Sequence, residues 1–244
     1  MTQIASPKGI LLDLDNTLYD YKSCHKEGLN AASELFLRET RVDRERFSEL
    51  YNICRHEINR ELNGLASSHN RLLYFQRVIE KTKLGVKAWL TLDLYNVYWD
   101  VFIRNIRLYD GVFDFLKKCC EKGVKIALVT DLTADVQMKK IAILGLDNYI
   151  DAVVTSEEAR LEKPLMPIFR LALKKIGVAA QEVWVIGDSM EKDIVGGNSI
   201  GATTILFDKE GIGILSGDEN DKPMFIVKSF PEIIDMLNGV HHRK

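Results

Sequence analysis

Short, unbroken apolar runs recur along the chain and alternate with longer stretches of helical spacing. The runs are GILL (9–12), VKIALV (124–129), AVV (152–154), EVWVI (182–186) and TTILF (203–207). Polar residues or glycine follow each run, which is typical of strands buried on both faces of a parallel sheet. Helices are predicted between them, near 111–121, 134–145, 165–176 and 191–199. The alternation predicts an α/β fold with a parallel sheet and right-handed crossovers.

The stretch from about residue 20 to residue 108 interrupts this rhythm directly after the first strand. It contains no run typical of a strand, and segments such as SELFLRETRVDRERFSELYNICRHEINREL place apolar residues at helical spacing. We interpret 20–108 as an inserted all-helical domain, and 1–19 plus 109–244 as the α/β core domain. The insert holds 15 Lys and Arg against 12 Asp and Glu. A mildly basic insert suits an anionic substrate, although a solvated helical surface is the simpler explanation.

Composition narrows the classes of protein. The chain has 244 residues, of which 46% are hydrophobic and 28% charged, as in soluble globular proteins. A net charge of −2 lacks the basic excess of nucleic-acid binders, so we expect no nucleic-acid partner. No apolar run approaches the roughly 18 residues that span a membrane, and the first residues do not resemble a signal peptide. The four cysteines lack metal-ligand spacing and indicate reduced thiols in a cytoplasmic protein. We expect the protein to be a monomer or a homodimer.

Polar residues suited to one reaction follow three of the predicted strands. DLDNT (13–17) follows the first, Thr130 and Asp131 follow the second, and GDS (187–189) follows the fourth. The carboxyl ends of parallel strands form the edge at which ligands bind. The acids Asp13 and Asp15 would repel one another there, unless they cap a turn or a cation lies between them. Lys163-Pro164 is predicted to open the helix that precedes the fourth strand.

DLDNT, Thr130, Lys163 and GDSMEKD resemble, in this order, the four motifs of the haloacid dehalogenase (HAD) superfamily of phosphohydrolases. DxDxT alone is a weak signal, but four motifs in order on their expected elements are specific. The resemblance covers the whole chain, since the helical insert lies where subfamily I of that superfamily has a C1-type cap. It implies a Rossmann-like core, a helical cap and a Mg²⁺-dependent phosphatase acting on a small phosphorylated metabolite.

The resemblance also implies a role for each motif residue. Asp13 is the expected nucleophile, which forms an aspartyl-phosphate. Asp15 is the expected general acid and base, a role that needs a raised pKa, which a neighbouring carboxylate favours. The carboxylates of Asp13 and Asp188, with the backbone carbonyl of Asp15, are the expected Mg²⁺ ligands, because Mg²⁺ prefers oxygen.

The remaining motif residues are expected to hold the phosphate and to support the site. Lys163 would neutralise the negative charges of Asp13 and the phosphate. The Thr130 hydroxyl, together with backbone N–H groups, would hold the phosphate oxygens. The backbone groups expected to do so belong to Leu14, Asp15 and Asp131. Asp193 would orient Lys163 or a metal-bound water, with Ser189 beside it. Ser189 could also simply cap the following helix.

Departures from the family pattern leave questions open. Asp131 stands where the family usually has Asn or Ser, and its charge would repel phosphate unless it points away or caps a helix near Thr133. Asp15 favours phosphate chemistry over dehalogenation, because dehalogenating members lack an acid there and use no Mg²⁺. A phosphomutase of the same family and a non-catalytic binding module stay open as alternatives.

Residues of the cap are expected to contact the organic part of the substrate, because such caps close over the site and exclude water. Any of them could instead be an ordinary surface residue. The candidates are His25, His56, Arg60, His69 and Arg71.

Overall fold

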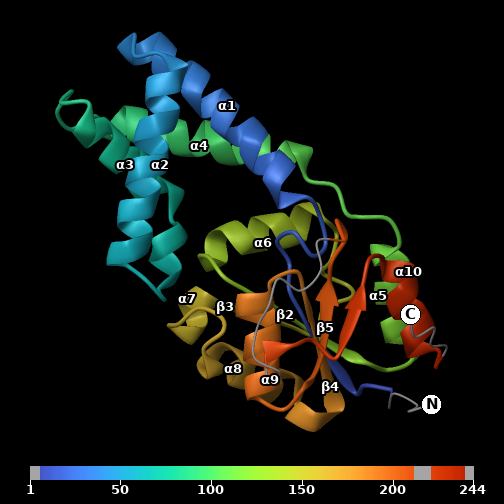
Figure 1. Ribbon diagram of the computed structural model, residues 1–244. Coiled ribbons are helices and arrows are strands. Elements are labelled where there is room, and N and C mark those ends of the chain that lie inside the picture. Colours follow the sequence, from blue (N-terminus) through green and yellow to red (C-terminus); the bar gives the residue numbers. More distant parts are fainter. Residues whose placement is uncertain (1–5, 212–220, 240–244) are drawn as a thin grey trace.

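The computed structural model describes residues 6–211 and 221–239, and within them six parallel strands form one sheet in the order β3-β2-β1-β4-β5-β6 (Figure 1). The strands are β1 (Gly9–Leu12), β2 (Lys125–Thr130), β3 (Ala152–Thr155), β4 (Val183–Gly187), β5 (Thr203–Phe207) and β6 (Phe225–Val227). The predicted α/β class is confirmed. The edge strand β6 was not predicted from the sequence.

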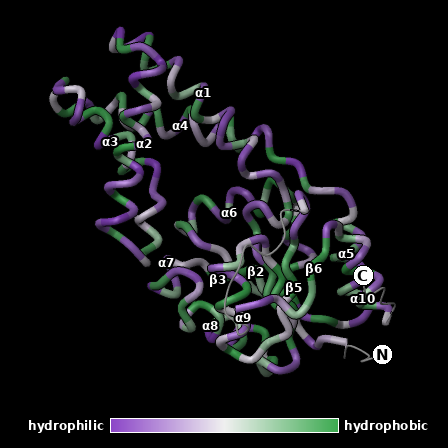
Figure 2. The backbone as a smooth tube through the Cα atoms, viewed as in Figure 1, coloured by the Kyte–Doolittle hydropathy of each residue, from purple (hydrophilic) through white to green (hydrophobic). Residues whose placement is uncertain are grey.

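Alternate residues of the strands face two layers of helices. Ile10 and Leu12 belong to one apolar cluster with α5 (Val112–Glu121), α6 (Ala134–Ile143) and α10 (Phe230–Leu237). Leu11 belongs to a second cluster, on the face covered by α8 (Met166–Ile176). Figure 2 shows the strands as mainly hydrophobic, whereas hydrophilic and hydrophobic positions alternate along the helices. Burial on both faces explains why these strands are continuous apolar runs.

Smaller elements connect the strands and differ in part from those predicted. They are α7 (Ser156–Ala159), the 3₁₀ turn η2 (Ala180–Glu182), the π-helical turn η3 (Met190–Ile194) and α9 (Val195–Ser199). The single helix predicted near 191–199 is therefore a π turn followed by a short α-helix. Helix α8 begins at Met166 with Pro167 in its first turn. The prediction that Pro164 opens this helix is wrong, because Pro164 lies two residues before it.

Four helices between β1 and β2 form a bundle that stands above the carboxyl edge of the sheet (Figure 1). They are α1 (Tyr21–Thr40), α2 (Arg44–Glu61), α3 (Arg71–Lys81) and α4 (Ala88–Asn105), with the 3₁₀ turn η1 (Ala66–His69) before α3. Asp20 begins α1 as its N-cap, accepting a hydrogen bond from the Ser23 N–H at 3.0 Å. We refer to residues 20–108 as the cap.

The tip of the cap contacts the core at Glu162. The Ser68 hydroxyl donates to Oε1 of Glu162 at 3.1 Å, and Nε2 of His69 lies 3.2 Å from the same oxygen. The backbone N–H of Glu162 donates to the carbonyl of Gly64 at 3.0 Å. Glu162 is buried and directly precedes Lys163, so these contacts fix the cap tip beside the motif lysine.

Two further observations bear on the class of protein. None of the helices in the described ranges combines the length and the apolar character that crossing a bilayer requires. The cysteines are free thiols, three of them buried (Cys24, Cys54 and Cys119).

Candidate active site

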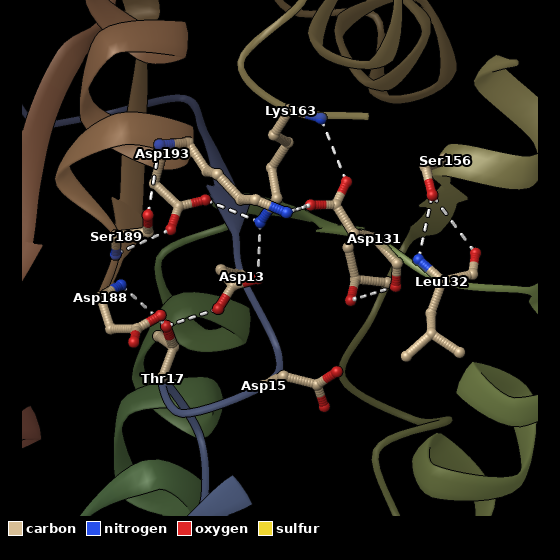
Figure 3. A network of polar contacts seen from close by, with 12 residues as sticks. Asp13, Asp15, Thr17, Asp131, Leu132, Ser156, Lys163, Asp188, Ser189 and Asp193 are labelled. Atoms are coloured by element: carbon tan, nitrogen blue, oxygen red, sulfur yellow. Dashed lines mark hydrogen bonds and ion pairs between the residues drawn. The ribbon is translucent and has the colours of Figure 1, made fainter. Parts of the chain in front are cut away.

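The sequence motifs meet at the carboxyl edge of the sheet, beneath the cap (Figure 3). Asp13 follows β1, Thr130 ends β2, and Asp188 follows β4, all on neighbouring strands. Lys163 reaches this edge from the loop before α8. A cavity of about 220 Å³ lies here, and Asp13, Asp15, Thr130 and Lys163 all line it. The volume lies below the roughly 300–1,000 Å³ of sites for drug-sized ligands, which favours a small metabolite.

Lys163 is the central cation of the site. Its Nζ donates to Oδ1 of Asp13 at 2.6 Å and to Oδ1 of Asp193 at 2.7 Å (Figure 3). Burial lowers the pKa of Lys163, but the facing charges of Asp13 and Asp193 raise that pKa well above its ordinary value. The Ser189 N–H holds the second oxygen of Asp193 at 3.1 Å. A Cβ on Gly187 would lie 2.2 Å from the Asp193 carboxyl carbon, so only glycine lets Asp193 approach this closely.

Three carboxylates are gathered beside this lysine. Oxygens of Asp13, Asp188 and Asp193 lie within 4.8 Å of one another. Burial raises the pKa of Asp13 well above its ordinary value despite Lys163. Burial and then the charge of Asp193 raise the pKa of Asp188 to about 6. Such a set of hard oxygen donors, mutually repelling and only partly neutralised, fits a divalent cation such as Mg²⁺.

Thr17 ties the two expected metal ligands together, a role that was not predicted. Its hydroxyl donates to Oδ2 of Asp13 at 2.6 Å and accepts from the Asp188 N–H at 3.1 Å. The side chain is fully buried. The threonine of DLDNT therefore sets the orientation of the Asp13 carboxylate.

Asp15 is directed away from Asp13 and toward α6 (Figure 3). Nζ of Lys140 donates to both carboxylate oxygens, at 2.7 and 2.8 Å, and the Tyr19 hydroxyl donates as well. Burial alone raises the pKa of Asp15, but the charge and hydrogen bonds of Lys140 outweigh burial, so the pKa is lowered. The prediction of a raised pKa is wrong for this conformation, because the dominant neighbour is a cation rather than a carboxylate.

Lys140 was not predicted as a site residue, and its surroundings are unusual for a lysine. It has no exposed surface, and burial lowers its pKa, an effect that Asp15 opposes. Four aromatic rings lie 5.3–6.0 Å from its Nζ, two of them in the cap helix α4. These rings are Tyr19, Tyr21, Trp99 and Phe102. Cation–π attraction and Asp15 together stabilise the buried charge. Helix α6, which carries Lys140, also supplies Gln137, whose side-chain amide donates to Thr130 and to Asp15.

The charge of Asp131 is balanced by neighbours from elsewhere in the chain. Nζ of Lys192 lies 2.7 Å from Oδ2, and the backbone N–H of Lys163 donates to Oδ1 at 3.1 Å. Asp131 does not cap α6, because Glu157 accepts from the first N–H of that helix, that of Ala134. Asp131 is one of the residues that line the cavity. The expected repulsion of phosphate is thus reduced by an ion pair.

Of the residues proposed to contact the substrate, His25, His69 and Arg71 line the cavity. His56 and Arg60 do not: within the described residues they are exposed and lie outside its lining. On α2 it is Arg55 that reaches the cavity. His56 is one residue further along, about 100° around the helix, so the same helix directs it elsewhere.

His25 is expected to titrate far below an ordinary histidine. Its Nδ1 lies 2.7 Å from the Tyr98 hydroxyl, and its ring stacks on Tyr21. Burial, with the charge of Arg55, lowers its pKa to about 4. Because this pKa lies below the unfolded value of about 6.5, folding stability should fall as the pH drops from about 6.5 to about 4. NMR titration of the ring, assigned with His25→Gln, tests this, and a midpoint at pH 6 or above would contradict it.

Comparisons with known proteins agree with this geometry. A sequence model of the family described as haloacid dehalogenase-like hydrolase matches residues 10–207. The chain is 39% identical over 203 residues to a ribulose-1,5-bisphosphate 5-phosphatase of Halopiger xanaduensis, covering 82% of this chain and 84% of that protein. It is 26% identical to a glyceraldehyde 3-phosphate phosphatase of Methanocaldococcus jannaschii, covering 96% of this chain and 98% of the other.

Among solved structures, a HAD phosphatase from Thermococcus onnurineus superposes with a TM-score of 0.72. That match covers 95% of this chain and 98% of the other at 21% identity. At such an identity the likeness speaks for the fold, which is the α/β core with a helical insertion.

Proposed function

Because this chain belongs to the haloacid dehalogenase-like hydrolase family and to its phosphatases, we propose that it is a Mg²⁺-dependent phosphatase of a small sugar phosphate. The observation that carries the proposal is the buried contact of Lys163 with Asp13 beside Asp188, in a cavity lined by residues of both the core and the cap. The substrate class follows from two relatives named for their activity on phosphorylated sugars, one with five carbons and one with three. We propose that Asp13 accepts the phosphoryl group.

The proposed binding of the phosphate uses groups that already converge on Asp13. Lys163 offsets the charge of Asp13, and the Thr130 hydroxyl lies at the end of the neighbouring strand β2. Asp13 and Asp188 would hold Mg²⁺, with the backbone carbonyl of Asp15. When bound, the ion supplies positive charge that lets an anionic carboxylate and an anionic phosphate approach each other. Asp193 keeps Lys163 in place at 2.7 Å.

In the proposed reaction an oxygen of Asp13 forms a bond to phosphorus while the bond from phosphorus to the sugar oxygen breaks. Asp15 gives its proton to that leaving oxygen and later removes a proton from the water that hydrolyses the aspartyl-phosphate. Asp15 is now paired with Lys140, so it must turn away from Lys140 to reach the leaving oxygen. A bound phosphate raises the pKa of Asp15 by repelling its charged form, which favours the protonated acid.

Metal removal tests the proposal. We expect the purified protein to release inorganic phosphate from ribulose 1,5-bisphosphate, glyceraldehyde 3-phosphate and an aryl phosphate when Mg²⁺ is present. Chelation should abolish release, and added Mg²⁺ should restore it. Mg²⁺ alone should also raise the melting temperature, because it binds only where folding gathers Asp13, Asp188 and Asp193.

Three results would contradict this assignment. Hydrolysis that persists after chelation would exclude the metal-dependent mechanism. Isomerisation of a sugar phosphate that depends on a bisphosphorylated sugar, without net phosphate release, would identify a phosphomutase. Absence of turnover on every substrate would favour a binding module.

A further inference from the structure

The two walls of the cavity differ in charge. All five acidic residues of its lining belong to the core, whereas the cap contributes none. The cap residues of the lining are Tyr21, His25, Arg55, His69 and Arg71. When the phosphate of a substrate lies at Asp13, the rest of the substrate therefore shares the cavity with the two guanidinium groups of the cap, those of Arg55 and Arg71.

Arg71 is the most buried cation of this wall. It is the first residue of α3 and only 7% exposed. One terminal nitrogen donates to the carbonyl of His69 and the other to the Tyr21 hydroxyl. Its Nε is buried without a partner. In the described parts of the chain no carboxylate oxygen lies within 4.0 Å of the Arg71 guanidinium, the distance that defines an ion pair. The two lysines that line the cavity, Lys163 and Lys192, do form ion pairs.

Aromatic rings, rather than carboxylates, surround the buried charge of Arg71. The rings of Tyr21, Tyr74, Tyr98 and Trp99 lie 5.6–5.9 Å from the guanidinium carbon. Such contacts stabilise a cation, but they do not supply the negative charge with which a buried ion is ordinarily paired. A buried guanidinium that belongs to the lining of a cavity and lacks a carboxylate partner is suited to an anion that arrives with the ligand.

We propose that Arg71, together with Arg55 of the same cavity lining, binds a second phosphate of the substrate, the one that is not hydrolysed. The proposal rests on the function proposed above and narrows the substrate class to sugars phosphorylated at both ends. Two guanidinium groups match the double charge of a phosphate, whereas a carboxylate needs only one. Asp13 of the core and Arg71 of the cap both line this cavity, so one substrate could contact both residues.

The unaltered enzyme provides the first test. Rates are compared for ribulose 1,5-bisphosphate, for the corresponding monophosphate, for a phosphorylated sugar acid of the same length and for an aryl phosphate. We expect kcat/KM to be at least 30-fold (about 2 kcal/mol) higher for the bisphosphate than for the monophosphate. A sugar acid that equals the bisphosphate would overturn the choice of phosphate over carboxylate.

The second test uses Arg71→Met, with Arg60→Met as the matched control on the exposed surface of the cap. Arg71→Met should lower kcat/KM for the bisphosphate by about 100-fold, mostly through KM, since a buried charge contact to the ligand is lost. Its effect on the aryl phosphate should stay below about 5-fold. Arg71→Lys, which keeps the charge, should recover part of the loss. Arg60→Met should leave the ratio between substrates unchanged.

Each outcome decides between the two proposals. Equal losses on both substrates in Arg71→Met would mean that Arg71 only supports the cap, and would overturn the second phosphate site. A wild-type enzyme that hydrolyses the bisphosphate and the monophosphate equally well would also overturn the second phosphate site, even if Arg71→Met failed to fold. No hydrolysis of any substrate by the unaltered enzyme would instead overturn the proposed function.

Discussion

Replacing Asp13 by Asn should lower kcat for phosphate release on the order of 10⁴–10⁶-fold, the range expected when a covalent enzyme loses its nucleophile. The amide is nearly the same size as the carboxylate, so packing should be kept. Without metal, the variant should melt at the same temperature as the unaltered protein or higher. The reason is that burial beside Asp188 and Asp193 disfavours the charge of Asp13, as its raised pKa indicates. Phosphate release and thermal melting measure both effects.

Asp114→Asn is a suitable control for this experiment, because Asp114 is an exposed residue in the first turn of α5, outside the cavity lining. It should leave kcat unchanged. The melting shift produced by Mg²⁺ should survive in Asp114→Asn and shrink in Asp13→Asn, since the latter loses one of the proposed ligands. Residual activity above about 1% in Asp13→Asn would contradict the covalent role of Asp13.

Replacing Lys140 by Met should lower the free energy of unfolding by about 3 kcal/mol at neutral pH. This value is the lower end of the range for removing one partner of a buried ion pair. We expect the lower end because the Asp15 side chain keeps 22% of its surface exposed. The aromatic rings around Nζ should accept the apolar Met side chain. Chemical denaturation of wild type, Lys140→Met, Asp15→Asn and the double variant measures the coupling.

The double variant distinguishes a broken ion pair from poor packing. If the charge of Asp15 causes the loss, Asp15→Asn in the Lys140→Met background should recover most of it. The loss should also shrink between pH 7 and pH 4. Without Lys140, burial is left to raise the pKa of Asp15, so in the variant the carboxyl can take up a proton in this range and lose its unpaired charge. In the wild type the pKa of Asp15 lies below its ordinary value, so the pair keeps its stabilising effect down to about pH 4. A loss independent of both pH and Asp15 would indicate a packing defect.

The sheet and the metal-ligand edge could be predicted because short-range patterns determine them. A strand buried on both faces must be apolar at every position, and the carboxyl ends of parallel strands must share one edge. This reasoning brought Asp13, Thr130 and Asp188 together. The strand order depends on contacts between distant segments. The short edge strand β6, with exposed Ile226 in its middle, lacks the continuous burial that marks the others.

The role of Lys140 and the burial of Arg71 were not predicted, although the sequence carries a signal for both. On α6 the buried residues are Val136, Gln137, Lys140 and Ile141, so a lysine and a glutamine occupy an apolar stripe. Arg71 likewise shares the buried stripe of α3 with Tyr74, Phe75, Val78 and Ile79. A charge at a core position of an amphipathic helix implies a partner or a ligand. On α2 the burial pattern could not have separated the residues, because His56 and Arg60 lie outside its buried positions and so does Arg55, which lines the cavity.

Asp131 shows what sequence alone could not provide. Its partner Lys192 is 61 residues further along and reaches it only through the packing of the π turn η3 against the sheet. From the sequence, the charge of Asp131 stood as an unexplained departure from a family pattern. In the folded protein it belongs to an ion pair at the rim of the cavity. The raised pKa expected for Asp15 failed for the same reason, since Lys140 is 125 positions away.

The contact of the cap tip with Glu162 provides an intrinsic reporter of cap movement. The N–H of Glu162 donates to Gly64 in the cap, whereas the next N–H, that of Lys163, donates to Asp131 in the core. Lifting the cap frees the first amide and leaves the second bound, while unfolding of the core frees both. The rates of hydrogen–deuterium exchange at these two adjacent amides therefore distinguish movement of the cap from unfolding of the core, without a dye or probe attached to the protein.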